Sequence, residues 1–198
     1  MLASASPRRQ ALLRAAGLDF RVAPADVDET PPPGLAPGEV ARRLALAKAL
    51  AGAEREAGDG LVLGADTIVV APDGRLLGKA RDEAEARAML LDRLASRWHR
   101  VVTGVALIAA RSGWAASAAV ESEVRMHGAD RLEPYVASGL WRGKAGAYGV
   151  QDEPSPVAAL RGSRSNVVGL PVEAVVALLA EAAAAATATA APGREGRP

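Results

Sequence analysis

The sequence predicts an α/β fold in which a mixed sheet is flanked by helices. Helical and strand-like patterns are interleaved along the whole chain, which argues against separate helical and sheet domains. Residues 61–71 (LVLGADTIVVA) form a β-rich apolar run that is typical of a strand buried on both faces. With 198 residues, of which 49% are hydrophobic, the chain has enough apolar material for one core. We therefore expect a single domain over residues 1–186.

The N-terminal part of the chain predicts two helices separated by a loop. Ser6 is a suitable N-cap and Pro7 suits a first helical turn, so a helix is expected over residues 8–16. Residues 19–23 are typical of a short strand, and residues 26–38 are acidic and then proline-rich, which predicts a loop. A long helical pattern follows over residues 37–57.

The rest of the chain predicts further strands and helices around the central apolar strand. The turn PDG follows that strand, and an acidic first turn then opens a helix at residues 82–94. The remaining predicted elements are strands at 99–110 and 113–126, a helix at 130–138, a Gly-rich and then acidic loop at 143–156, and a final helix at 171–186. Residues 187–198 form a low-complexity tail that we expect to be disordered.

Composition excludes several classes of function. The net charge of +1 provides no overall field that would attract nucleic acid or a membrane surface. The absence of cysteine excludes disulfides, zinc–thiolate sites and a cysteine nucleophile. There is neither a signal peptide ahead of the first motif nor an apolar run of membrane length, so a cytoplasmic protein is expected.

The stretch SASPRR, residues 4–9, predicts either a capped helix with surface arginines or one wall of an anion site. A loop that leads into a helix directs backbone N–H groups and the helix dipole toward one point. Ser4 and Ser6 add hydroxyl donors, and Arg8 and Arg9 carry guanidinium groups that match phosphate oxygens. Local evidence does not separate the two interpretations.

Acidic and basic side chains elsewhere suggest what such an anion site would contain. Asp66 and Thr67 interrupt the apolar strand, and a buried carboxylate must be paired or hold a metal ion, unless it is hydrogen-bonded to the neighbouring backbone. Asp28 and Glu29, in the loop sequence VDET, could be Mg²⁺ ligands or solvated surface acids. Three lysines, Lys48, Lys79 and Lys144, could surround a polyphosphate or lie on the surface. The sequence GKAG lacks the P-loop pattern.

Several motifs in order resemble the Maf family of nucleoside triphosphate pyrophosphatases. They include LASASPRRQALL, VDE, GADTIVV, LGKARDEAEARAMLLDRL, KAGAYGVQ and SNVVGLP, and the resemblance runs from Leu2 to about Leu179. It implies a two-lobed fold around a cleft, like that of the inosine-triphosphate pyrophosphatases, and usually a homodimer. It also implies metal-dependent hydrolysis, with Mg²⁺ or Mn²⁺, between the α- and β-phosphates of a small-molecule nucleotide.

The resemblance also implies roles for matching residues. Asp66 corresponds to the proton acceptor, while Arg9, Thr67 and Gln151 correspond to positions that set substrate choice. The other matching positions line the cleft of the family: Ser6, Arg8, Glu29, Lys48 and Lys79. We expect Glu29 and Asp66 to be the metal ligands.

The motifs are similar to the branch of the family that prefers dTTP and UTP, with modified nucleotides left open as further substrates. SPRR and KAGAYGVQ agree with that branch, and a glutamine amide can both donate to and accept from a uracil or thymine edge. Three residues depart from the usual pattern: Ala80 replaces proline, Ser96 replaces glycine, and Asp152 replaces the glycine after Gln151. The alternative function is a nucleotide-binding regulator of cell division or septum formation with little catalysis.

Overall fold

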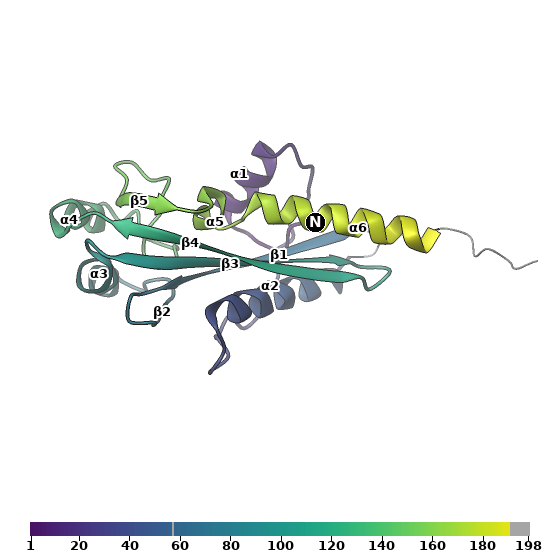
Figure 1. The fold of residues 1–198 in the computed structure, drawn as a ribbon, viewed down its shortest axis with the longest axis horizontal. Helices are drawn as coiled ribbons and strands as arrows, with labels where there is room; N and C mark the ends of the chain where they lie inside the picture. The colour runs from purple at the N-terminus through teal and green to yellow at the C-terminus, as the bar shows by residue number, and fades with distance from the viewer. Residues whose placement is uncertain (57, 191–198) are drawn as a thin grey trace, which may run out of the picture.

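A computed structural model describes residues 1–56 and 58–190 of the chain (Figure 1). Its elements, in chain order, are α1 (Pro7–Ala15), α2 (Pro37–Ala53), β1 (Leu61–Val70), β2 (Leu76–Leu77), α3 (Glu83–Arg87), the π-helix η1 (Ala88–Leu94), β3 (Trp98–Ala109), β4 (Ala115–Met126), α4 (Ala129–Ser138), β5 (Val157–Arg161), α5 (Arg164–Val168) and α6 (Val172–Ala190).

The strands form one five-stranded sheet in the order β2-β1-β3-β4-β5, and every pair of neighbouring strands is antiparallel. Among the described residues, parallel pairing is confined to isolated bridges, in which Leu2 pairs with Val22 and with Leu63. The predicted α/β fold with flanking helices is confirmed. The bridges of Leu2 are the only parallel pairing in the described part of the sheet. The connections between neighbouring strands reverse the chain direction, so these strands run antiparallel.

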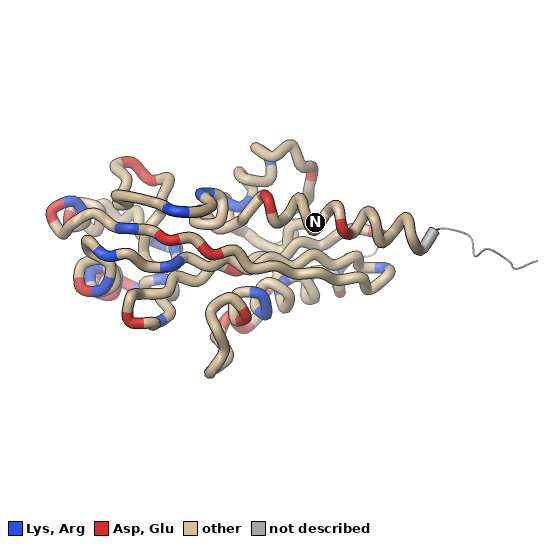
Figure 2. Tube along the Cα trace, viewed as in Figure 1, with Lys and Arg blue, Asp and Glu red and all other residues tan. Residues whose placement is uncertain are grey.

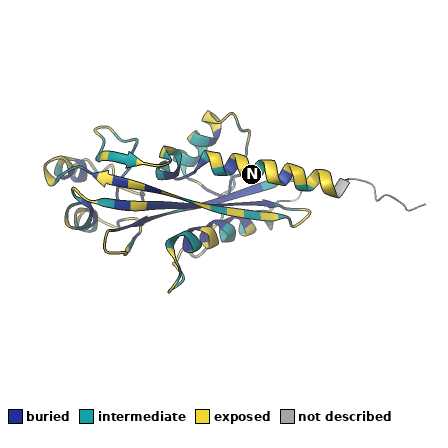
Figure 3. Ribbon diagram, in the orientation of Figure 1, coloured by how far each residue is buried: buried dark blue, intermediate teal, exposed yellow. Residues whose placement is uncertain are grey.

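Helices cover both faces of the sheet (Figure 1). Helix α2 packs on one face against β1 and β3, and α1 and α6 lie on the other. One apolar cluster joins α2 to the sheet through residues such as Val40, Leu44 and Ile68, and another joins α6 to it through Leu170 and Leu178. A third cluster gathers around η1 and α4 at the end of the sheet. Strands β1 and β3 are largely buried, whereas much of β4 and the outer side of α6 are exposed (Figure 3).

Two glycines let α2 lie directly on the backbone of the sheet. A Cβ atom on Gly64 would fall 2.1 Å from the carbonyl oxygen of Ala45, and one on Gly104 would fall 2.2 Å from that of Ala41. No side chain larger than hydrogen fits at either position. This close packing matters for function because Gly104 is the cross-strand partner of Asp66.

Most predicted elements agree with the structure to within a few residues, and the differences have local causes. The expected strand at residues 19–23 is reduced to the bridge at Val22. Helix α2 ends at Ala53, after which the chain turns and Glu56 forms an ion pair with Arg21. The helix predicted at 82–94 changes from α to π geometry at Ala88.

Other elements were not predicted, or extend further than expected. The short elements β2, β5 and α5 were not predicted at all. Helix α6 continues to Ala190, so residues 187–190 are helical and not part of a disordered tail. Residues 191–198, the remainder of the predicted tail, lie outside the described residues.

Charged residues of both signs alternate along the chain, without long blocks of one sign (Figure 2). This distribution agrees with the net charge of +1. No helix within the described ranges is long and apolar enough to cross a membrane.

Candidate functional site

A cleft of about 820 Å³ opens at the outer edge of β1. The first half of this edge is covered by the N-terminal residues, since Leu63 exchanges backbone hydrogen bonds with Met1 and Ala3. The far end is covered by β2, which pairs with Val69 and Val70. No described strand covers the stretch between them. Successive residues of a strand point to opposite faces, yet both Asp66 and Thr67 line the cleft because it lies at the strand's edge.

The opposite wall of the cleft comes from the loop at residues 143–151, which the sequence analysis identified by its glycines. Ala145 forms an isolated bridge with Lys79, and the amide of Gly146 donates to the carbonyl of Gly78. A Cβ atom on Gly146 would lie within 3.0 Å of the side chain of Val69. The loop is therefore fixed against the sheet next to the segment that carries Lys79.

Every residue predicted from the sequence to belong to the site lines this cleft. The set comprises Ser6, Arg8, Arg9, Glu29, Lys48, Asp66, Thr67, Lys79 and Gln151. These residues come from α1, α2, β1 and three loops, so only the fold brings them together.

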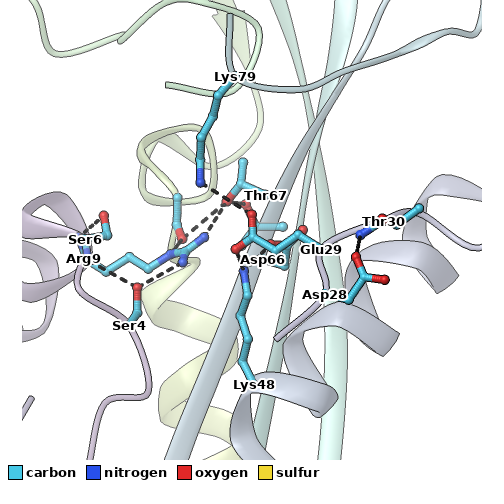
Figure 4. Close-up of polar contacts among 12 residues, drawn as sticks. Ser4, Ser6, Arg9, Asp28, Glu29, Thr30, Lys48, Asp66, Thr67 and Lys79 are labelled. Carbon is cyan, nitrogen blue, oxygen red and sulfur yellow. Dashed lines mark hydrogen bonds and ion pairs between the residues drawn. The ribbon is translucent and has the colours of Figure 1, made fainter. Parts of the chain in front are cut away.

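At the centre of the cleft, one lysine joins two carboxylates (Figure 4). The Nζ atom of Lys48 lies 2.6 Å from Oδ1 of Asp66 and 2.6 Å from Oε1 of Glu29. Lys48 and Asp66 are buried, whereas about half of the Glu29 side chain is exposed. Lys79 approaches from the other side, with its Nζ 3.4 Å from Oε2 of Glu29. Buried charges of this kind are stable only when they are paired.

The environment of Glu29 favours its ionised form. Burial alone would raise the pKa of Glu29, but the hydrogen bond and charge of Lys48, followed by those of Lys79, outweigh burial and lower it. Glu29 is therefore a carboxylate at neutral pH, and it faces Asp66 across the Lys48 ammonium.

Two convergent carboxylates fit a Mg²⁺ site of the kind that is completed by substrate. Mg²⁺ is commonly held by one or two carboxylates together with phosphate oxygens and water. Glu29 and Asp66 already converge on one cation, the Lys48 ammonium. In the described part of the chain, no group of three or more His, Asp or Glu side chains is arranged to hold a metal ion. The two carboxylates thus suit a metal ion that binds together with a polyphosphate, whose oxygens would be further ligands.

The guanidinium group of Arg9 donates hydrogen bonds to three other residues of the protein. Its Nε donates to the carbonyl of Gly169 at 2.8 Å, and its terminal nitrogens donate to the hydroxyls of Ser4 and Thr67, each at 3.2 Å. Burial lowers the pKa of Arg9, an effect that the charge of Asp66 opposes. Thr67 is itself fixed by Thr103, whose hydroxyl lies 3.0 Å away. Arg9 is consequently rigid, which suits a residue that shapes the cleft.

Arg8 is less constrained, in agreement with a ligand-binding role. Its only hydrogen bond among the described residues is to the carbonyl of Gly143, at 3.3 Å. The hydroxyl of Ser6 caps α1 by accepting from the amide of Arg9, and Pro7 occupies the first turn. The predicted helix cap is confirmed, and the same helix start lines the cleft, where the anion-site interpretation of SASPRR expects it.

Gln151 lies at the other end of the cleft in a polar group that the sequence did not predict. Its Nε2 donates to Oδ1 of Asp152 at 3.1 Å. The second carboxylate oxygen of Asp152 accepts from the hydroxyl of Tyr135 at 2.5 Å and from the ammonium of Lys144. Lys144, one of the lysines considered for polyphosphate binding, is thus paired within the protein.

Some residues differ in role from the sequence-based expectation. Asp28, which neighbours Glu29 in VDET, does not line the cleft, because its carboxylate accepts from the amide of Thr30 at 2.8 Å (Figure 4). Ser4 contributes its hydroxyl to Arg9 and not directly to an anion, and the contribution of the Gly169 carbonyl was missed, although Gly169 lies in the quoted motif SNVVGLP. A backbone carbonyl that accepts a hydrogen bond from a buried arginine has no sequence pattern by which it could be predicted.

Taken together, the cleft is suited to a polyanion that carries a metal ion. Five basic side chains line it, against two acidic ones. A focused positive field attracts phosphate groups, and a fixed carboxylate beside it can accept a proton from water.

The chain matches the family model described as "Maf-like protein" over residues 1–182. It is 46% identical over 184 residues to the "dTTP/UTP pyrophosphatase" of Symbiobacterium thermophilum, covering 91% of this chain and 92% of the relative. It is 50% identical over 184 residues to the protein of the same name from Caulobacter vibrioides, with coverage of 90% and 93%.

Among solved structures, the chain is similar to a nucleoside-triphosphatase / dITP/XTP pyrophosphatase from Mycobacterium abscessus. The TM-score is 0.41 at 16% identity, over 98% of each chain. A similarity of this degree carries no argument about function. The family match, by contrast, extends over the helices, strands and loops that build the cleft, and the predicted family motifs supply its lining. The chain belongs to the Maf-like protein family.

Proposed function

We propose that this chain is a nucleoside triphosphate pyrophosphatase that prefers dTTP and UTP. It would hydrolyse the bond between the α- and β-phosphates and release the nucleoside monophosphate and pyrophosphate. The observation that carries the proposal is the central cluster, in which Lys48 holds Asp66 and Glu29 together at 2.6 Å each. The names of the relatives, "dTTP/UTP pyrophosphatase", support the choice of substrate.

In the proposed mechanism, the side chains bind the triphosphate and move one proton. Arg8, Lys48 and Lys79 neutralise charge on the phosphate oxygens, and this charge stabilisation supplies most of the catalysis. Asp66 takes the proton of the water that attacks the α-phosphorus, and pyrophosphate leaves with the bonding electrons.

A divalent cation fits the proposal as a partner of the substrate. Glu29 and Asp66 would hold Mg²⁺ or Mn²⁺, directly or through water, and the ion would neutralise further charge on the triphosphate. The rigid Arg9, Thr67 and the amide of Gln151 would set the choice of base, and Ser6 would contribute to the wall near the phosphates. The proposal includes a cytoplasmic homodimer, as the family resemblance implies.

The test is a panel of nucleoside triphosphates incubated with the protein and Mg²⁺ or Mn²⁺, with product identification. Pyrophosphate and monophosphate released fastest from dTTP and UTP would support the proposal. An Asp66→Asn variant should keep the fold and lose roughly 10²–10⁴-fold in kcat, the usual contribution of a positioned base. Nucleotide binding without turnover in the wild type would favour the regulator, and an even profile would favour a broad pyrophosphatase.

A further inference from the structure

Asp152 lies where the resemblance would place glycine, and its carboxylate is buried next to Gln151 and Lys144, two residues that line the cleft. Its side chain is 9% exposed and that of Lys144 is 10% exposed. One oxygen, Oδ2, accepts from the Tyr135 hydroxyl at 2.5 Å and from the Lys144 ammonium. The other, Oδ1, lies 3.1 Å from Nε2 of Gln151. Oδ2 of the carboxylate is therefore fixed by Tyr135 and Lys144, while Oδ1 accepts a hydrogen bond from Gln151.

This arrangement determines which way the Gln151 amide faces. An ionised carboxylate only accepts hydrogen bonds, so the NH₂ group of the amide, and not its oxygen, must face Asp152. Burial and the bond to Asp152 raise the pKa of Tyr135, so its hydroxyl keeps its proton and remains a donor to Oδ2. Both donors on Oδ2 hold the carboxylate in place, and Oδ1 remains for Gln151.

With Nε2 engaged, the amide oxygen Oε1 of Gln151 is left over. It is buried and receives no hydrogen bond from the described residues. An unsatisfied buried acceptor is unfavourable, so a ligand that supplies a donor to it binds more tightly. Gln151 lines the cleft, so a nucleotide bound in the cleft would lie next to this amide.

The space for this pair depends on Gly149. A Cβ atom there would lie 2.5 Å from Nε2 of Gln151 and 2.7 Å from Oδ2 of Asp152. The amide of Gly149 also donates to the Tyr135 hydroxyl at 3.1 Å, so the loop backbone is part of the same network. The orientation of Gln151 is thus set by the fold around it.

We propose that Asp152 is a positioning residue that turns the Gln151 amide so that its oxygen accepts a hydrogen bond from the base. This inference rests on the proposed function, because it takes a nucleotide to be the ligand. Uracil and thymine carry a ring N–H between two carbonyls and match this acceptor. Cytosine has an unprotonated nitrogen at the same position and would face the amide oxygen with a lone pair. The cleft consequently selects the imide bases through an acceptor that Asp152 orients.

The test measures binding separately from turnover. Calorimetric titration with the α,β-methylene analogues of UTP and CTP, in the presence of Mg²⁺, gives an affinity ratio that does not depend on hydrolysis. The wild type should bind the UTP analogue roughly tenfold more tightly, or better. Asp152→Asn can offer Gln151 either a donor or an acceptor, so the amide can turn and the ratio should fall about fivefold or more.

Two further variants isolate the role of the carboxylate. Asp152→Ala removes the carboxylate and should lower the ratio in the same way, which keeps the test valid if Asp152→Asn does not fold. Tyr135→Phe removes a donor from Oδ2 but leaves Oδ1 on Gln151, so it should preserve the ratio while lowering stability. In a Gln151→Met background the ratio should be near one, and Asp152→Asn should change it no further.

The outcomes distinguish this inference from the proposed function. A wild-type ratio near one, or an unchanged ratio in both Asp152 variants, overturns the inference even if UTP is hydrolysed. Equal losses of affinity for both analogues would indicate a merely structural role and also overturn it. A selective wild type whose selectivity is lost in the variants, but which releases no pyrophosphate from UTP, would support the inference and refute the enzymatic proposal.

Discussion

The ammonium of Lys48 lies 2.6 Å from the carboxylate of Asp66, and both side chains are buried against the sheet. Lys48 is on α2 and Asp66 is on β1, so their contact depends on the distance between this helix and this strand. The same ammonium holds Glu29 from a loop. The charge balance of the cleft thus depends on how closely α2 approaches the sheet.

Replacing Lys48 with methionine should destabilise the protein and increase its response to metal. Removing one partner leaves Asp66 buried without its counter-charge, which typically costs about 3–5 kcal/mol. Mg²⁺ can then take the place of the ammonium between the two carboxylates, so it should raise the melting temperature of the variant more than that of the wild type. Thermal unfolding with and without Mg²⁺ measures both effects.

Lys79→Met is the matched control, because Lys79 contacts Glu29 from an exposed position. It should cost no more than about 1 kcal/mol, as is usual for surface ion pairs. Equal stability of Lys48→Met and the wild type would contradict the role of the buried ammonium.

Gly64→Ala should separate α2 from the sheet and thereby impair the site. The new Cβ would fall 2.1 Å from the carbonyl oxygen of Ala45 and 2.7 Å from the amide nitrogen of Ala49. Overpacking against backbone costs about 1–3 kcal/mol, and the shift would draw Lys48 away from Asp66. We expect lower unfolding free energy in urea together with lower pyrophosphate release at temperatures where the variant is folded.

Gly38→Ala tests the same helix without the clash. Its Cβ would meet only the side chain of Ala119, at 3.8 Å, and alanine is favoured over glycine in helices by up to about 1 kcal/mol. This variant should match or exceed the wild type in stability and retain its activity. If Gly64→Ala behaved like Gly38→Ala, helix position would not control the site.

Stability should decline as the pH falls from about 6.5 toward 4, because of His99. Burial lowers the pKa of His99 from 6.5 to about 4, against a smaller opposing effect of a backbone hydrogen bond at Arg97. Between these values the unfolded chain binds a proton that the folded chain does not, so acidification favours unfolding, by at most about 3 kcal/mol. Above pH 6.5 this contribution is constant.

Urea unfolding at a series of pH values measures this slope, and His99→Gln should flatten it. Glutamine can still bond the hydroxyl of Tyr148, which lies 2.7 Å from His99 Nε2, but it does not titrate. Carboxyl groups with a lowered pKa, such as Glu29, lose stability only below their usual range near 4.5, so they do not obscure the upper part of the window. An unchanged slope in His99→Gln would refute this assignment.

Ser96→Gly should stabilise the fold by about 0.5–1 kcal/mol. Ser96 has a φ of 57°, in the left-handed region that favours glycine, and its side chain is exposed. Ala147 has a similar φ of 63°, but its methyl group is fully buried. Ala147→Gly should therefore gain less, or lose stability, because it removes apolar contacts. Calorimetric melting compares the two variants, and a lower melting temperature for Ser96→Gly would contradict the prediction.

The sequence predicted the elements whose patterns are long and local. The apolar run of β1 and the hairpin of β3 and β4 follow directly from composition and turn residues. The two-residue β2 and the five-residue β5 and α5 are too short to have a period. β2 and β5 form by pairing with β1 and β4, and α5 packs against β3 and β4. The π geometry of η1 differs from an α-helix in its hydrogen bonds but not in its sequence pattern.

The candidate site residues were predicted from motifs that resemble a family, and the structure brings all of them to one cleft. Their pairings could not be predicted in the same way. Nothing local connects Tyr135 with Asp152, or Arg9 with Gly169, because these contacts depend on how loops far apart in the chain are folded together. The departure at Asp152 was visible in the sequence, but its partners became clear only from the structure.

The most direct test of the central claim is hydrolysis of UTP in water labelled with heavy oxygen, followed by mass spectrometry of the products. If Asp66 activates water for attack on the α-phosphorus, the label should appear in UMP and the pyrophosphate should remain unlabelled. Asp66→Asn should form neither product at a comparable rate. Label in pyrophosphate or in free phosphate, or full activity of Asp66→Asn, would contradict the proposed reaction.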